Sequence, residues 1–263
     1  MIVTQTMMTH PLRFLTPDWP APANVRAYIT TRQGGVSRSP WDGFNLADHV
    51  GDDPSAVAAN RALLVEKLHL PTAPCWLHQV HGTTVIDADG SCPGLSGDAS
   101  ITQTPNRVCA VLTADCLPVL FCDRLGAEVG IAHAGWRGLA HGVLESTVCA
   151  LQADPKDLLV WLGPGIGPGA FEVGDDVRDT FIQEHAAATR AFSPQAFSPR
   201  VCSPMGDRWL ADLYLLARQR LQRLGVRAIH GGGFCTYRDR ERFFSYRRDG
   251  VTGRMASVIY LLN

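Results

Sequence analysis

Short runs of apolar residues, separated by turn-forming residues, recur along most of the chain. Runs of this length between glycines, prolines and polar residues indicate buried strands. We expect strands over residues 25–31, 108–113, 119–122, 129–132, 158–162 and 257–262. Pro118 should interrupt the apolar stretch that contains the second and third of these strands, because proline cannot donate to a ladder.

Three segments show the signals of helices. Asp53 can cap a helix over 54–68, and a proline stands at its first position. A second helix is expected over 139–151. A third is expected over 209–225, because apolar positions recur there at helical spacing and Gly225 suits the residue after a helix end.

The order of these elements predicts the fold class. Groups of strands are interrupted by helices without strict alternation, which favours an α+β fold with a mixed sheet. The turn-rich stretches 87–104 and 193–207 read as loops and lack the character of interdomain linkers. We therefore predict a single domain over 1–263.

Composition narrows the class of protein. Apolar residues make up 46% of the chain and charged residues 19%, which excludes disorder. A formal net charge of −1 argues against nucleic acid or an acidic membrane as a partner. No apolar run approaches the roughly 20 residues that span a bilayer, and residues 1–14 lack the pattern of a signal peptide. We expect a cytoplasmic protein.

Eight cysteines stand at positions 75, 92, 109, 116, 122, 149, 202 and 235, and none forms a C-x-x-C pair. In a chain of this length without a secretory signal, disulfides are not needed. We expect reduced thiols, most of them buried as small apolar residues.

Polar and metal-ligating residues interrupt the apolar pattern at 79–82, 113–118 and 132–138. Within these stretches, His81, Cys116 and His133 form a set that could bind zinc tetrahedrally with one position left open. Their separations, 35 and 17 residues, are no motif, so turn histidines and a buried thiol remain the alternative. His78 competes with His81, because residues three apart on a strand point to opposite faces.

A second chemistry uses part of the same set. Cys116 could act as a nucleophile with His133 as its base, as in cysteine hydrolases that cleave amides. Asp115 or Asp98 would then orient the imidazole. The zinc site requires His81, whereas a Cys–His pair does not.

These motifs resemble a known family, the YfiH-like laccase-domain proteins, which are also labelled polyphenol oxidases and purine nucleoside phosphorylases. The resemblance rests on Gln79-Val-His-Gly82, Thr113-Ala-Asp-Cys-Leu-Pro118 and His133-Ala-Gly-Trp-Arg-Gly138. Further matching pieces lie at 31–37, 44–46, 51–52, 60–61, 162–167, 171–174, 243–249 and 252–256. They follow the family's order over nearly the whole chain.

The resemblance implies an α+β sandwich with His81, Cys116 and His133 as metal ligands and catalytic residues. It also implies phosphorolysis of adenosine, inosine and 5′-methylthioadenosine, with adenosine deamination as a further activity. Zinc is the expected metal. A single copper ion, as in a phenol oxidase, is the alternative, because imidazole and thiolate accept both. A four-copper oxidase is improbable, because none of the nine histidines stands in an H-x-H pair.

Phosphorolysis requires groups that hold a phosphate anion and a purine. Arginine suits phosphate because its planar fork donates two parallel hydrogen bonds. We expect Arg61, Arg137 or Arg32 to supply this contact, and Asn45 to contact the substrate. Trp136 could stack on the purine. Each arginine could equally be an ordinary surface or ion-paired residue.

Deamination requires a metal that activates water, together with a general acid or base. The usual H-x-E and P-C-x-x-C motifs of zinc deaminases do not occur. Glu172 and Asp98 are the candidates for the acid or base. A module in which the metal only stabilises the fold is the non-catalytic alternative.

Overall fold

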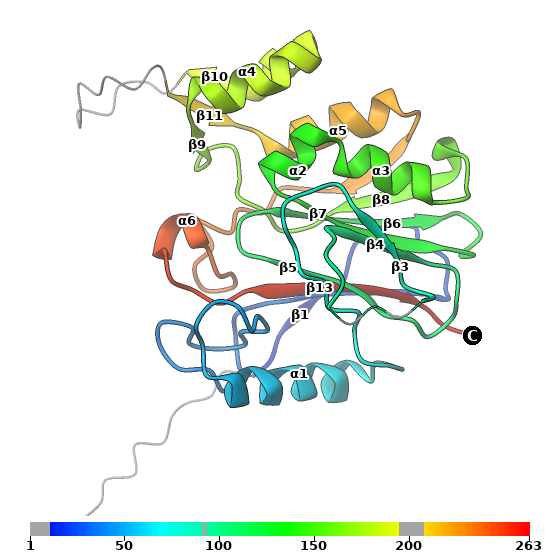
Figure 1. Cartoon of the computed structure of the whole chain (residues 1–263), viewed down its shortest axis with the longest axis vertical. Coiled ribbons are helices and arrows are strands. Elements are labelled where there is room, and N and C mark those ends of the chain that lie inside the picture. The colour runs from blue at the N-terminus through cyan, green and yellow to red at the C-terminus, as the bar shows by residue number, and fades with distance from the viewer. Residues whose placement is uncertain (1–10, 91, 93, 195–207) are drawn as a thin grey trace, which may run out of the picture.

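Two β-sheets lie face to face in the computed structural model, which describes residues 11–90, 92, 94–194 and 208–263. Helix α1 (Pro54–Leu68) covers the outer face of the smaller sheet, and helices α2 (Trp136–His141), α3 (Val143–Ala150) and α5 (Leu213–Arg223) lie over the larger one (Figure 1). This arrangement confirms the predicted α+β sandwich.

The smaller sheet has four antiparallel strands in the order β1-β2-β13-β5. Their bounds are β1 Phe14–Leu15, β2 Val25–Thr30, β13 Met255–Leu261 and β5 Cys109–Thr113.

The larger sheet has six strands in the order β12-β8-β6-β7-β4-β3. It is mixed, as predicted, because β12 pairs with β8 and β3 with β4 in parallel, whereas the other pairs are antiparallel. The bounds are β12 Ala228–Gly231, β8 Leu158–Leu162, β6 Leu117–Asp123, β7 Val129–Ala134, β4 Ala99–Thr102 and β3 Val85–Asp87.

Apolar side chains fill both spaces around the larger sheet. On β6, Val119 and Phe121 pack toward the helices, whereas Leu120 and Cys122 pack toward the smaller sheet. A strand buried on both faces reads as a continuous apolar run. This is why such strands were visible in the sequence.

A small third sheet, in the order β10-β11-β9, lies beside helix α4 (Asp175–Glu184) (Figure 1). Its strands are β10 Phe192–Pro194, β11 Trp209–Ala211 and β9 Glu172–Val173. The remaining helix of the described chain, α6 (Tyr246–Asp249), is a single turn, and two 3₁₀ segments cover Pro155–Asp157 and Ala186–Ala191. The helices in the described part of the chain are too short or too polar to span a bilayer.

The helix predictions need two corrections. The segment expected as one helix over 139–151 forms α2 and α3, because Gly142 adopts φ +98° and ends the first helix. The segment expected from residue 209 begins as strand β11, and α5 starts only after Asp212 caps it through the N–H of Leu215.

The loop predictions also change. The stretch 87–104 contains β4, which pairs with both β7 and β3. Most of the stretch 193–207 lies outside the described residues, and its first two residues belong to β10. Pro118 does not break the apolar stretch as expected, because β6 runs through it opposite His133.

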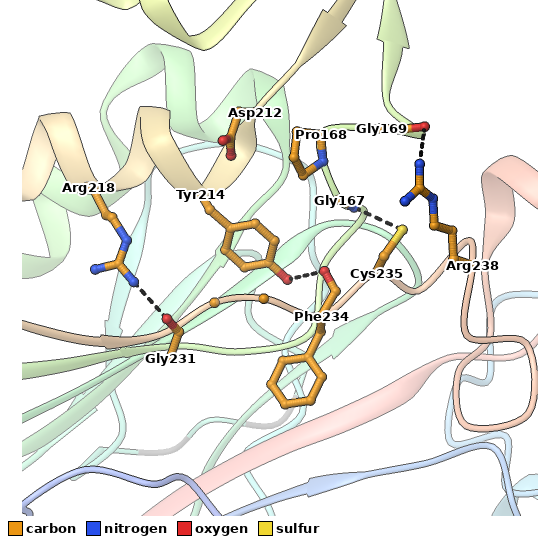
Figure 2. A pocket seen from close by; sticks show the side chains of 12 residues that line it. Gly167, Pro168, Gly169, Asp212, Tyr214, Arg218, Gly231, Phe234, Cys235 and Arg238 are labelled. Atoms are coloured by element: carbon orange, nitrogen blue, oxygen red, sulfur yellow. Dashed lines mark hydrogen bonds between the residues drawn. The ribbon is translucent and has the colours of Figure 1, made fainter.

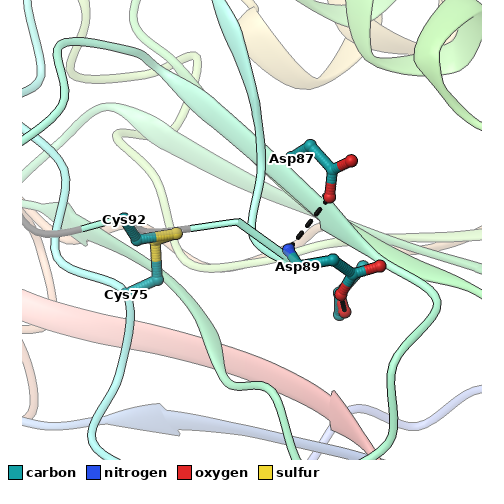
Figure 3. Close-up of a disulfide and its surroundings, with 5 residues drawn as sticks. Cys75, Asp87, Asp89 and Cys92 are labelled. Carbon is teal, nitrogen blue, oxygen red and sulfur yellow. Dashed lines mark hydrogen bonds between the residues drawn. A yellow bond between two sulfur atoms is a disulfide. The ribbon is translucent and has the colours of Figure 1, made fainter.

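The expectation of reduced thiols is wrong at one pair, because Cys75 and Cys92 form a disulfide (Figure 3). Five other described cysteines are free. Cys109 and Cys122 are buried as expected, but Cys116 and Cys235 are half-buried and Cys149 is exposed, so most of the free thiols are not buried. Cys202 lies outside the described residues.

Candidate metal centre

Three elements bring the predicted donors to one end of the sheets. His133 is the penultimate residue of β7. Cys116 lies in the turn that connects β5 of the smaller sheet to β6 of the larger sheet, where Asp115 adopts φ +90°. His81 lies in the loop before β3, and its φ of +60° is unusual for a residue with a side chain.

The three side chains converge. One ligating atom from each of His81, Cys116 and His133 lies within 4.8 Å of the others. The Cys116 sulfur is 3.8 Å from Nε2 of His81, and the two imidazole rings meet edge to face with centroids 4.7 Å apart. His133 is buried, whereas His81 is exposed, so the cluster is open on the His81 side.

Asp98 is a fully buried carboxylate that connects the segments carrying both histidines. Its oxygens accept hydrogen bonds from the backbone N–H groups of Val80, His81 and Gly82 at 2.7–3.1 Å. It also lies 2.8 Å from Nδ1 of His133. When Nδ1 carries the proton, Nε2 is unprotonated and can ligate a metal ion. This is the usual arrangement of a metal-binding histidine.

The thiol and the buried imidazole stabilise each other's charged forms. Burial raises the pKa of Cys116, but the nearby positive charge of His133 and hydrogen bonds from both histidines outweigh it and bring the pKa to about 6. Burial lowers the pKa of His133, but the Cys116 thiolate and Asp98 raise it to about 9. The metal-free cluster therefore favours a thiolate–imidazolium pair, and its thiolate is the form that binds metals.

Gly135 allows the side chains of His81 and Cys116 to lie close to the start of α2. A Cβ at this position would lie 2.8 Å from Cδ2 of His81 and 2.9 Å from the Cys116 sulfur, which is closer than real contacts allow. The glycine of the motif His133-Ala-Gly-Trp-Arg-Gly138 thus has a packing role at the cluster.

Two of the predicted phosphate-binding arginines have other partners. Arg32 donates to Asp42 at 3.1 Å and lies over the Phe244 ring. Arg61 donates to the carbonyl of Leu46, pairs with Asp48 at 3.2 Å and lies over the Trp76 ring. Neither is brought into contact with the three donors.

Arg137 and Trp136 follow directly from the His133 motif at the start of α2. The guanidinium of Arg137 lies 4.4 Å from the centroid of the Trp136 ring, and its side chain is exposed. Among the described residues Arg137 has no ion pair, so it is the one predicted arginine without a charged partner.

Asn45 is buried and supports a neighbouring arginine that the sequence did not single out. Its amide donates to Ala47 and Asp52, and its carbonyl oxygen accepts from the backbone N–H of Arg254 at 2.9 Å. Arg254 immediately precedes β13, whose first residue pairs with Thr113, the last residue of β5. This register places Arg254 next to the Cys116 turn.

Electrostatics agree with that placement. Burial lowers the pKa of Arg254, while the negative charges of Cys116 and Asp115 act to raise it. The sequence did contain a signal for Arg254, because it lies in the stretch 252–256 that matches the family. The sequence analysis assigned no role to it.

The remaining candidates lie apart from the three donors or serve other contacts. The exposed side chain of His78 is not part of the cluster, although its backbone bonds to Leu95 and Gly97. Asp115 accepts from Thr236 and from the backbone of Arg247, so Asp98 is the carboxylate that orients His133. The Glu172 carboxylate pairs instead with Arg208.

Residues 26–262 match the family model described as "Multi-copper polyphenol oxidoreductase laccase". The chain belongs to this family. Within the described part of the chain, His81, Cys116 and His133 make the single group of three or more candidate metal donors. That set suits one ion and not a cluster of several copper ions.

Known proteins and solved structures are similar to this chain over nearly its whole length. A purine nucleoside phosphorylase of Pseudomonas aeruginosa is 57% identical over 94% of this chain and 98% of its own. The purine nucleoside phosphorylase YfiH of Escherichia coli is 52% identical over 95% and 99%. A Neisseria meningitidis protein of known structure has a TM-score of 0.87 and 49% identity, covering 95% of this chain and 99% of that one.

Proposed function

We propose that this protein is a zinc-dependent purine nucleoside phosphorylase that acts on adenosine, inosine and 5′-methylthioadenosine. The observation that carries the proposal is the convergence of His81, Cys116 and His133, with Asp98 holding His133. The names of relatives at 57% and 52% identity supply the reaction class. The expected substrates are therefore a purine nucleoside and phosphate.

The donor set fits a single metal ion. Two imidazoles and a thiolate suit zinc, and also copper. Three protein donors leave a fourth position open, which is typical of a catalytic rather than a structural zinc site. When bound, the ion supplies Lewis acidity at the exposed side of the cluster. His81, Cys116 and His133 would hold it, and Asp98 would keep Nε2 of His133 available.

Arginines beside the cluster fit the phosphate co-substrate. In phosphorolysis a phosphate oxygen bonds to C1′ while the C1′–N9 bond breaks, its electron pair stays with the purine, and the purine takes up a proton. Arg254 next to the Cys116 turn and the free Arg137 can hold the anion. The rings of Trp136 and the exposed Tyr246, which lies beside Arg254, offer surfaces on which a purine can stack.

The test is release of hypoxanthine from inosine by the zinc-loaded protein with and without phosphate. Cleavage should require phosphate, and His81→Ala and Cys116→Ala should each abolish it. His78→Ala and Cys149→Ala are matched controls, because both side chains are exposed and lie outside the cluster. Full activity of either cluster variant in metal-free form would refute the proposal, and metal analysis of purified protein decides between zinc and copper.

A cysteine hydrolase that cleaves an amide is the second candidate. One observation favours it, because Cys116, His133 and Asp98 form a connected thiol–imidazole–carboxylate series with a thiol pKa of about 6. A hydrolase should lose activity to iodoacetamide and keep it in the presence of a chelator. A phosphorylase that depends on the ion should lose activity to the chelator.

We also propose two further activities for the metal centre. Adenosine deamination would release ammonia from adenosine without phosphate, and the assay for it is ammonia formation. A single-copper phenol oxidase would consume oxygen with a phenol only after copper loading. A cytoplasmic location also stays a prediction.

A further inference from the structure

A cavity of about 440 Å³ lies where the parallel strands β8 and β12 end (Figure 2). We call it the glycine-lined pocket, because Gly167, Gly169 and the consecutive Gly231, Gly232 and Gly233 form much of its wall. The carboxyl ends of neighbouring parallel strands are a common place for ligands in sheets covered by helices. The volume suits a small molecule rather than a bare ion.

The glycines leave backbone donors free at this pocket. Gly231, Gly232 and Gly233 all have positive φ, from 70° to 97°. Successive residues in such conformations can present several N–H groups to one anion. The N–H of Gly232 donates to Leu162, but those of Gly169, Gly233 and Phe234 have no partner among the described residues.

Two arginines add positive charge to the wall. Arg218 donates to the carbonyls of Ile229 and Gly231, which holds its guanidinium against the end of β12. Arg238 lies on the other side, where it donates to the carbonyl of Gly169 (Figure 2). A Cβ on Gly169 would lie 2.3 Å from a nitrogen of Arg238, so the missing side chain makes room for this guanidinium.

The wall carries one opposing charge. Asp212 is the N-cap of α5, and one of its oxygens is used by the N–H of Leu215. Two guanidinium groups against one carboxylate leave the lining with a net positive charge. The hydroxyl of Tyr214 accepts from the N–H of Gly165 and is near the carbonyls of Gly163 and Phe234, so it serves the wall rather than a ligand.

We propose that the glycine-lined pocket binds the phosphate group of a small phosphate ester, such as a pentose phosphate, separately from the metal centre. A phosphate ester has three terminal oxygens that can accept from the free N–H groups and from a guanidinium group of the wall, whereas a carboxylate has two. The cavity volume of about 440 Å³ exceeds what a phosphate group alone needs, which leaves room for a sugar.

A shared wall separates the two sites. Asp115, the residue before Cys116, accepts the N–H of Ile166 through its carbonyl and the hydroxyl of Thr236 through its carboxylate. Ile166 and Thr236 each adjoin a lining residue, Gly167 and Cys235. Asp115 therefore links the wall of the pocket to the metal centre through its backbone and its side chain.

The experiment is calorimetric titration of the metal-loaded protein with ribose 5-phosphate, inorganic phosphate and ribose. Ribose 5-phosphate should bind, ribose should not, and inorganic phosphate should bind more weakly than the ester. Arg238→Gln should weaken ester binding by about tenfold, as expected for a lost charged hydrogen bond. Arg240→Gln is the matched control, because this exposed arginine stands two residues away and does not line the pocket.

A second readout locates the ligand. Cys235 lines the pocket, and its sulfur accepts the N–H of Gly167, so bound ester should slow its alkylation by iodoacetamide, with exposed Cys149 as the internal reference. Ester binding should persist in Cys116→Ala, which disrupts the metal centre. These results do not depend on phosphorolysis.

Three outcomes would overturn the proposal. The first is equal affinity of Arg238→Gln and Arg240→Gln for the ester. The second is loss of binding in Cys116→Ala, which would place the ester at the metal centre. The third is tighter binding of inorganic phosphate than of the ester, which would assign the pocket to the free anion.

Discussion

Asp98 is the residue on which the geometry of the candidate centre depends. It is fully buried, it accepts three backbone N–H groups around His81, and it contacts Nδ1 of His133. A single carboxylate thus sets the conformation of one ligand loop and the orientation of the other ligand. The sequence named Asp98 only as one of several candidates, because its proximity to His133 arises from the pairing of β4 with β7.

Replacing Asp98 by Asn should weaken metal binding by roughly 10- to 100-fold. The amide keeps the size of the carboxylate but directs an NH₂ group at backbone donors, so His133 loses its charged acceptor. Competition with a chelator measures the change. Asp89→Asn is the control, because Asp89 accepts from Thr102 and Gln103 in a different loop. Equal metal affinity of the two variants would contradict this role.

Cys116 gives a pH-dependent prediction in the metal-free protein. Its pKa is about 6, because the neighbouring His133 outweighs the effect of burial. Below that pH the thiol is protonated and unreactive, and above it the thiolate reacts. Alkylation by iodoacetamide, followed by peptide mass, should therefore reach half its maximal rate near pH 6 at Cys116.

In His133→Ala the midpoint at Cys116 should move up toward the ordinary thiol value of about 8.5. Cys149 is exposed and serves as the reference thiol in the same sample. An identical pH profile for Cys116 with and without His133 would rule out the charge pairing.

At the scale of elements, the start of α2 determines how closely the ligands can approach. Gly135 precedes this helix, and a Cβ there would meet both His81 and Cys116 at less than 3.0 Å. Gly135→Ala should therefore displace a donor and reduce metal affinity while the helix still forms. Gly90→Ala is the control, because the nearest atom to its added Cβ is 3.7 Å away. Equilibrium dialysis against zinc compares the two, and equal occupancy would show that the ligands adjust.

Elements with local signals were predictable. Helix α1 matches its expected bounds because Asp53 and Pro54 define its start within the sequence. The split between α2 and α3 was missed because the apolar spacing continues through Gly142. Strands β9 and β11 were missed because each has three residues or fewer and depends on partners far along the chain.

The candidate centre was predictable in composition but not in geometry. His81, Cys116 and His133 were named from chemistry and from the family motifs. Their convergence depends on strand pairing, because β7 pairs with β6, which follows Cys116, and with β4, which follows the His81 loop. Arg254 received no role for the same reason, since only the pairing of β13 with β5 places it beside the Cys116 turn.

The whole molecule is held together by apolar packing on both faces of the larger sheet. Phe121 is fully buried between that sheet and the helices, so Phe121→Ala should lower the free energy of unfolding by about 3–5 kcal/mol. Leu125, with 87% of its surface exposed, is the control, and its replacement by Ala should change stability by less than about 0.5 kcal/mol. Urea titration of the metal-loaded protein measures both, and similar midpoints would contradict this packing.

The Cys116 turn connects β5 of the smaller sheet to β6 of the larger sheet. Both histidines, in contrast, lie in or next to strands of the larger sheet. An ion held by all three would therefore fasten the two layers at their common edge and oppose any sliding between them. Free metal at 100 times its dissociation constant would add about 2.7 kcal/mol to the folded state. The melting temperature should consequently rise with the concentration of free metal, even when no substrate is present.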